Sequence, residues 1–156
     1  MHKLLLCFEM LGEESVTYEN YIKAQLVRFA VDEAYHMGGV EPTLAVAQVI
    51  ANRVAAGWCG GDWLKVLESA YEYVGTLHPS PKVEPRDLAF RRILQSIDDV
   101  YYGIADDSNV NNDQEQKSLY YAQLNKINRE WFKTNILDDL TNHPMIAKVG
   151  QFNFFA

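Results

Sequence analysis

The sequence predicts an α+β protein that is mostly helical, with a small β element towards its C-terminal end. Apolar residues recur at steps of three and four through most of the chain before residue 103, which is typical of helices with one buried face. Glycines and prolines separate these segments, and short aromatic runs that favour strands come last. We expect one domain over residues 1–156, because either half alone would bury too small a core.

The N-terminal half is expected to contain four helices. Residues 1–17 form a helical extension, in which 3–11 is a short helix and Ser15 or Thr17 can cap the next helix. That second helix spans about 18–37 and ends at Gly38 and Gly39, because glycine adopts the left-handed conformation at low cost. Pro42 suits the first position of the third helix. The third helix is expected over 44–54, closed by glycines, and the fourth over 63–73.

The C-terminal half is expected to mix one long helix with loops and strands. That helix should turn Leu94, Ile97, Tyr101, Leu88 and either Phe90 or Arg91 inward. The expected elements are a proline-rich loop at 75–85, a helix at 86–103, a polar surface loop at 105–116, strands at 119–121 and 147–155, and a connecting segment around 131–140.

Composition limits the partners. The formal net charge is −7 and the sequence pI is about 5.0, so binding to nucleic acid is disfavoured. No segment approaches the ~20 apolar residues of a membrane span. The apolar run after Lys3 is too short for a signal peptide and is followed at once by Glu9. Cys7 and Cys59 are expected as buried or half-buried free thiols; neither a metal site nor a cofactor is expected.

Glu33 is the candidate catalytic residue. It falls on a stripe of one helix face whose other members are apolar. The stripe consists of Ile22, Leu26, Phe29, Ala30, Glu33 and Met37. A carboxyl group on an apolar face loses solvation, which raises its pKa and suits it to donate a proton. Asp32 is expected to point elsewhere, into solvent.

The pattern alone leaves other roles open. A lone glutamate on such a stripe is more often a rim residue that reaches water or pairs with a cation, and Arg28, Arg53 and His36 are conceivable partners of Glu33. Arg53 itself is expected to hold a carboxylate or backbone carbonyls across the core. The many aromatic side chains can form core or stack on sugar rings.

An ordered set of segments resembles the cell-wall hydrolase family of spore cortex-lytic enzymes. The segments are Ala30-Val31-Asp32-Glu33-Ala34, a glycine-containing turn, Ala45 to Val54 ending in Asn-Arg-Val, Val66 to Tyr73, Leu119-Tyr120-Tyr121, Trp131, and Ile146 to Phe154. The resemblance covers roughly Leu26 to Ala156. The chain departs from the family at Phe152, where the family has His, and at Gln123, where the family has Asn; its glycine turn is also about one residue longer.

The resemblance implies a lysozyme-like domain that cleaves the MurNAc–GlcNAc bond of peptidoglycan. It implies lytic transglycosylation with Glu33 as the single acid and then base, which agrees with the lack of a convincing partner carboxylate in the sequence. Tyr73, Tyr120, Tyr121 and Gln123 are the candidates for lining the sugar groove. No cofactor is implied; the expected partners are peptidoglycan glycan strands and other virion proteins.

The small acidic domain without a signal peptide suggests a bacteriophage protein. It is expected either in the virion or in the host cytoplasm before release to the periplasm and cell wall, as a virion-associated lysin or an endolysin. The first alternative is a non-catalytic virion structural or assembly protein on the same scaffold. The second is a protein-interaction domain whose motifs match by chance.

Overall fold

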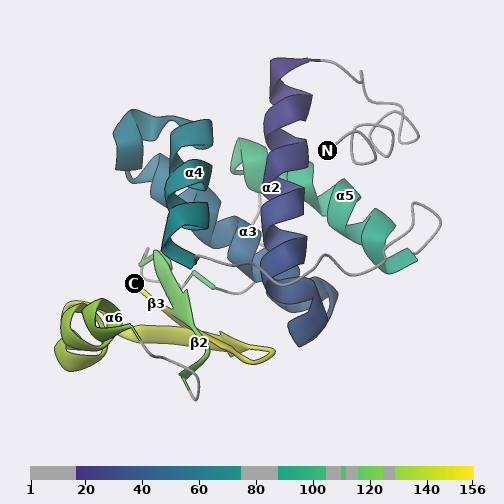
Figure 1. Ribbon diagram of the computed structural model, residues 1–156. Coiled ribbons are helices and arrows are strands. Elements are labelled where there is room, and N and C mark those ends of the chain that lie inside the picture. Colours follow the sequence, from purple (N-terminus) through teal and green to yellow (C-terminus); the bar gives the residue numbers. More distant parts are fainter. Residues whose placement is uncertain (1–16, 75–87, 105–109, 112–115, 125–128) are drawn as a thin grey trace.

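A computed structural model describes residues 17–74, 88–104, 110–111, 116–124 and 129–156. These residues form helices and a three-stranded antiparallel sheet with strand order β1-β3-β2, which confirms the mostly helical α+β class (Figure 1). The elements are α2 (Tyr18–Ala34), η1 (Tyr35–Met37), α3 (Val40–Ala55), η2 (Trp58–Gly61), α4 (Trp63–Val74), α5 (Leu88–Tyr102), β1 (Tyr120–Ala122), α6 (Glu130–Asn135), η4 (Leu137–Asp139), β2 (Met145–Val149) and β3 (Phe152–Phe155).

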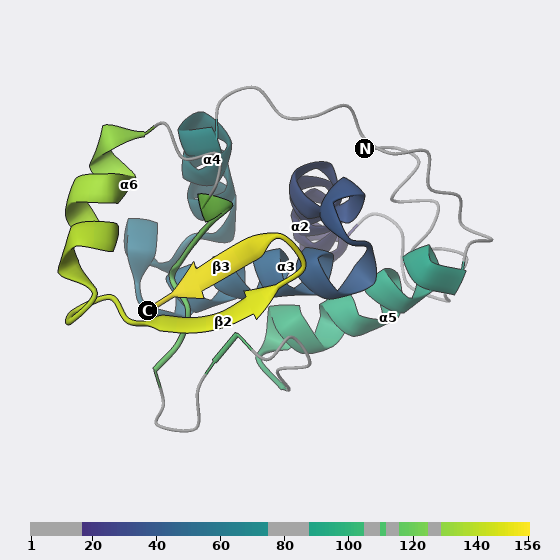
Figure 2. The same ribbon diagram turned by 90° about the horizontal axis from the view of Figure 1, so that it is seen from below.

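Helix α3 is the centre of the helical part. It contacts α2, α4 and α5, and it also contacts β1 and β2 of the sheet. Figure 2 shows the β2–β3 hairpin lying across α3. Residues 44–50 of α3 are all buried, and only Gln48 among them is polar. A helix that is enclosed by other elements needs apolar residues around its whole circumference, and this sequence supplies them.

The ends of α2 and the start of α3 follow the expected signals, with one correction. The Thr17 hydroxyl accepts a hydrogen bond from the backbone N–H of Asn20 at 3.1 Å and caps α2. After η1, Gly38 (φ +146°) and Gly39 (φ +85°) end the helical segment as predicted. The prediction that Pro42 occupies the first helical position is wrong, because α3 already begins at Val40. Proline is tolerated there because the first-turn N–H groups need no partner within the helix.

The C-terminal strands form a hairpin where a single strand over 147–155 was expected. Val149 pairs with Phe152, so Gly150 and Gln151 form a two-residue turn. Gly150 has φ +60°, and a Cβ there would lie 3.1 Å from the backbone oxygen of Met37. The turn therefore sits tightly against the segment that follows α2, and a side chain at position 150 would be both crowded and strained.

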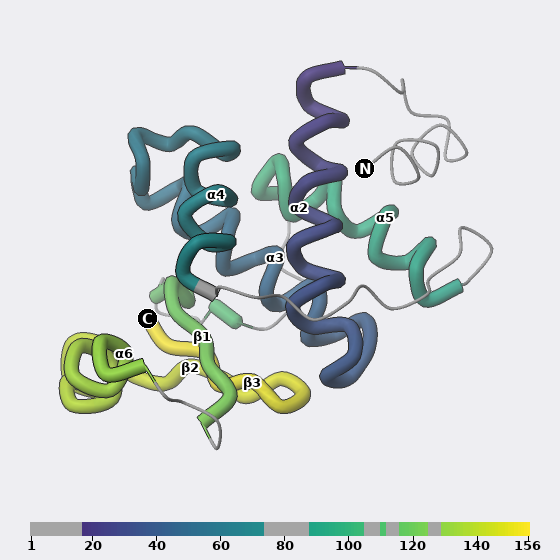
Figure 3. The backbone as a smooth tube through the Cα atoms, in the orientation of Figure 1, coloured from purple at the N-terminus to yellow at the C-terminus, as the bar shows by residue number. Residues whose placement is uncertain are grey.

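The sheet has two differently covered faces, because side chains alternate along a strand. Tyr121 of β1 and Phe154 of β3 pack into the main core with the helices. Tyr120 and Phe155, one residue along in each strand, pack instead against a second apolar cluster that includes Phe132 of α6. The tube view in Figure 3 shows β1 passing below the end of α4, with α6 to one side.

Three burial predictions are wrong. Leu88 is 81% exposed, whereas Phe90 is buried and Arg91 exposed, so the inward face of α5 starts at Phe90. Asp32 is buried rather than solvated, and its carboxylate lies 3.9 Å from the Arg28 guanidinium. Cys59 is an exposed free thiol because it lies in the glycine-rich η2 turn at the surface.

Other expectations fall on residues outside the described ranges. These are the helix at 3–11, Ser15, Cys7, the loop at 75–85 and most of the loop at 105–116. Within the described ranges, no helix combines the length and apolar character needed to cross a membrane.

Candidate active site

Glu33 lies in the last turn of α2. Ile22, Leu26, Phe29 and Ala30 on the same stripe are buried, as the spacing predicts, and Glu33 itself is partly buried. Burial raises the pKa of the Glu33 carboxyl, and interaction with the Tyr121 side chain opposes this rise. The carboxyl group therefore holds its proton to a higher pH than an exposed glutamate, which is the state a general acid needs.

Tyr121 brings its phenol to Glu33 from the inward face of β1. Its hydroxyl is buried and lies close enough to lower the pKa of the Glu33 carboxyl, but the two groups do not form a hydrogen bond of normal geometry. Burial, followed by the nearby Glu33 charge, raises the pKa of Tyr121 well above its usual value, while Arg53 opposes this. Tyr121 thus stays protonated. A small movement of its side chain would let the hydroxyl donate a hydrogen bond to a Glu33 carboxylate.

Side chains of α3 fix the backbone that leads into β1. The Arg53 Nε donates to the Leu119 carbonyl at 2.8 Å, and the Asn52 amide donates to the Ser118 carbonyl at 2.8 Å. Gln48 in turn donates to the Asn52 side-chain oxygen at 3.0 Å. Arg53 therefore holds a backbone carbonyl, one of the two roles expected for it. These bonds set the position of Tyr120 and Tyr121 relative to α2 and α3.

Phe152 supports the Tyr121 ring. Its ring lies edge-on to Tyr121 with 5.5 Å between centroids, and Phe154 stacks on Tyr121 at 6.0 Å. Both phenylalanines are buried in the main core. Phe152 thus places an apolar ring against the Tyr121 phenol, and this ring cannot exchange protons.

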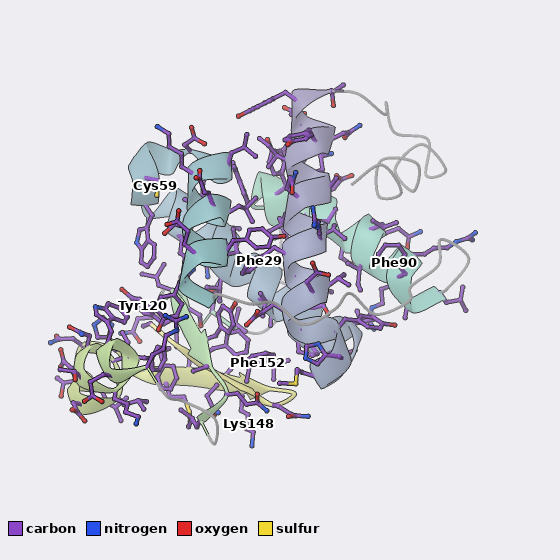
Figure 4. All side chains as sticks on the ribbon, in the orientation of Figure 1. Phe29, Cys59, Phe90, Tyr120, Lys148 and Phe152 are labelled. Carbon is purple, nitrogen blue, oxygen red and sulfur yellow. The ribbon has the colours of Figure 1, made fainter. Side chains whose placement is uncertain are left out.

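Four aromatic side chains from different elements gather beside this centre; we call Trp58, Tyr73, Tyr120 and Trp131 the aromatic cluster. Tyr120 lies 5.6 Å from Trp58 and 6.2 Å from Trp131 between ring centroids. Tyr73 lies 6.1 Å from Trp131. Figure 4 shows Tyr120 below the end of α4 and beside α6. Trp131 is 50% exposed and Tyr73 37%, so the cluster presents aromatic surface to solvent.

Two arginines lie over rings of this cluster. The Arg53 guanidinium is 5.0 Å from the Trp58 ring centroid, and the Arg129 guanidinium is 4.8 Å from that of Tyr73. Burial raises the pKa of Tyr73, and Arg129 and then Arg53 oppose the rise, so Tyr73 lies within electrostatic reach of both cations. Burial lowers the pKa of Arg53, while the neighbouring tyrosines oppose this. Arginine remains charged despite such shifts.

The structure places four of the five predicted site residues in two groups, on opposite sides of β1. Tyr121 faces Glu33, while Tyr120 joins Tyr73 in the aromatic cluster on the other side of β1; Arg53 lies within electrostatic reach of all three tyrosines. Gln123 instead donates from its amide to the Gln151 side chain at 2.6 Å, at the exposed hairpin turn. No interaction between described residues links Gln123 to Glu33.

Trp58 and Arg129 are neighbours of the site that the sequence reasoning missed. Trp58 is partly buried and follows Gly57, whose left-handed conformation (φ +86°) turns the chain after α3; an aromatic residue directly after this glycine was an available signal. Arg129 stands two residues before Trp131, so the sequence itself already showed a cation close to an aromatic residue. His36 is exposed and does not contribute to the shift in the Glu33 pKa.

No family model, curated protein or solved structure matches this chain. Within the described part of the chain, no group of three or more His, Cys, Asp or Glu side chains is placed to hold a metal ion. The geometry around Glu33 is therefore the basis for assigning a chemistry to this protein.

Proposed function

We propose that this protein degrades peptidoglycan by cleaving the MurNAc–GlcNAc glycosidic bond through lytic transglycosylation. The observation that carries the proposal is the Glu33 carboxyl: it is partly buried on an apolar helix face, its pKa is raised, and Tyr121 approaches it from β1. The aromatic cluster, on the other side of β1 from Tyr121, offers ring faces on which sugars stack. The resemblance to the cell-wall hydrolase family, with its lysozyme-like domain, supports the same reaction.

In this reaction Glu33 acts twice. Its carboxyl group first donates a proton to the glycosidic oxygen, and the bond from that oxygen to C1 of MurNAc breaks. The resulting carboxylate then accepts the proton of the MurNAc C6 hydroxyl as that oxygen bonds to C1, which gives the anhydro product and consumes no water. Between the two steps, the Tyr121 hydroxyl can donate a hydrogen bond to the Glu33 carboxylate. A hydrolase with two carboxylates would need a second acidic group opposite the first, and none of the described acidic residues affects the pKa of Glu33.

Zymography on purified peptidoglycan tests the proposal, with wild type compared against Glu33→Gln. We expect clearing by the wild type and a loss of at least about a hundredfold in the variant, the usual contribution of a general acid. Glu41→Gln is the matched control, because Glu41 is exposed at the surface and pairs with the exposed Arg92. It should clear like the wild type. Circular dichroism should show that all three proteins are folded.

The outcomes separate the candidate roles. Absence of clearing by folded wild type over a range of pH would contradict the enzyme and favour a non-catalytic virion protein on this scaffold. Equal clearing by wild type and Glu33→Gln would contradict the catalytic role of Glu33 but not the enzymatic activity of the protein. Mass spectrometry of the products distinguishes the mechanisms, because transglycosylation leaves anhydro ends and hydrolysis leaves reducing ends. As a phage protein it would act from the virion or after release from the host cytoplasm.

A further inference from the structure

Arg53 and Arg129 give the aromatic cluster a charge that sugar stacking alone does not need. Ion pairs between described residues engage Lys23, Arg28 and Arg92. Neither Arg53 nor Arg129 pairs with a described carboxylate. The chain as a whole carries a net charge of −7, so two guanidinium groups over the rings of Trp58 and Tyr73 are a local exception to an acidic chain.

The two arginines differ in whether their guanidinium groups are available to a ligand. Arg53 is mostly buried and is engaged with the Leu119 carbonyl and the Trp58 ring. Arg129 is exposed and stacks on Tyr73, whose ring also faces Trp131. A guanidinium that lies over one ring keeps several N–H donors, which can bind a carboxylate in a bidentate manner.

We propose that Trp58, Tyr73, Tyr120 and Trp131 form a subsite for an amino-sugar glycan that bears carboxylates, and that Arg129 selects the acidic strand over a neutral one. Trp131 and Tyr73 offer ring faces to the sugar, and Arg129 binds a carboxylate that projects from it. In peptidoglycan this group can belong to the lactyl ether or to the stem peptide. The inference rests on the proposed function for the class of glycan.

Binding to the full chain carrying Glu33→Gln tests the subsite without turnover. Three ligands of similar length are titrated by calorimetry and tryptophan fluorescence: chitohexaose, which is neutral; peptide-free peptidoglycan strands; and peptide-bearing strands. We expect at least one acidic ligand to bind about threefold to fivefold more tightly than chitohexaose at low salt, the size of a partly exposed charge pair. The advantage should shrink as salt is added. Whichever acidic ligand shows it identifies the source of the carboxylate.

Variants in this background separate charge from stacking. Arg129→Gln should remove the preference for the acidic ligand, whereas Arg92→Gln, an exposed arginine on α5 paired with Glu41 at 3.1 Å, should keep it. Trp131→Ala should lower the affinity for all three ligands roughly fivefold, and Trp131→Phe should recover part of that affinity. Equal affinity for neutral and acidic strands, or a preference that survives Arg129→Gln, would overturn the proposal.

Failure of this inference is distinguishable from failure of the proposed reaction. If the wild type does not clear peptidoglycan but Glu33→Gln shows the expected ligand preference, the reaction is contradicted and the subsite is supported. If the wild type clears peptidoglycan and Arg129→Gln leaves the ligand preference unchanged, the subsite is contradicted and the reaction is supported.

Discussion

At the scale of single residues, the Glu33 carboxylate opposes folding whenever it is charged. The helix face it shares with Leu26, Phe29 and Ala30 removes water that would solvate the charge, and this burial dominates the smaller, opposing effect of Tyr121. A carboxyl group with a pKa raised by burial is typical of a functional site, where the perturbed pKa is the useful property.

The first residue-scale prediction concerns Glu33→Gln and pH. Below the ordinary glutamate pKa of 4.5 the side chain is protonated in both folded and unfolded chains, so wild type and variant should be about equally stable. Because the folded pKa is raised, the wild type should lose stability relative to the variant as pH rises from 4.5 through the folded pKa. The slope cannot exceed about 1.4 kcal/mol per pH unit, the value for one proton.

Urea unfolding of wild type and Glu33→Gln between acidic and neutral pH measures this difference. Glu41→Gln is the control for the loss of a glutamate, because Glu41 is exposed and pairs with the exposed Arg92. A free energy difference between wild type and Glu33→Gln that stays flat with pH would show that the Glu33 carboxyl is not desolvated.

The spacing along α2 predicted the apolar surroundings of Glu33 but not the burial of the neighbouring Asp32. Glu33 was accessible from sequence because spacing along one helix shows which face is apolar. The burial of Asp32 was not, because it depends on a second neighbour: α4 packs on α2 and brings Tyr71 within electrostatic reach of Asp32. The aromatic cluster likewise depends on where β1 and α6 meet in space, which no local pattern contains.

At the scale of elements, α3 positions the sheet through its polar side chains. Asn52 is buried and donates both to the Ser118 carbonyl and to the Asn111 side chain at 2.8 Å, while it accepts from Gln48. Residues 110–111 and 116–118 are thereby tied to the same helix that carries Arg53. The Asn-Arg pair at the end of α3 is therefore a structural link between the helical part and β1.

Asn52→Ala tests this link. We expect a loss of about 2–3 kcal/mol in the free energy of unfolding, because several buried polar groups lose their partner at once. Asn142→Ala, which removes only exposed hydrogen bonds to Asp139, should change stability by less than about 0.5 kcal/mol. Chemical denaturation gives both values. Similar small losses for the two variants would contradict the structural role of Asn52.

Elements with local end signals were the ones that the sequence predicted well. Thr17 and the glycines at 38 and 39 bound the segment from α2 to η1, and Gly57 closely follows α3, so these boundaries were predicted closely. The start of α3 at Val40 was missed by four residues. The β2–β3 hairpin was missed because Gly150 and Gln151 interrupt a short apolar run only briefly. Its turn is fixed by contact with Met37 and Pro42, far away in the sequence.

At the scale of the whole molecule, the sheet and helices share one core. Phe152 and Phe154 of β3 belong to the same buried cluster as residues of α2, α3, α4 and α5. The candidate acid is on a helix and its tyrosine partner on a strand, so their relative position is only as stable as this shared core. We therefore expect the described helices and sheet to unfold in a single cooperative transition, as small domains usually do.

Phe154→Leu tests that cooperativity. The Phe154 ring is fully buried against Tyr121, and a smaller side chain should cost roughly 1–2 kcal/mol, less than the 3–5 kcal/mol of a phenylalanine-to-alanine change. Native-state hydrogen exchange should show amides of β3 and of α3 opening with the same free energy, and both falling by the same amount in the variant. Leu88→Ala, at an 81% exposed position on α5, should leave both values nearly unchanged. A variant that lowers protection in β3 while α3 keeps its original value would show that the sheet opens on its own, and Tyr121 could then leave Glu33 without unfolding of the helices.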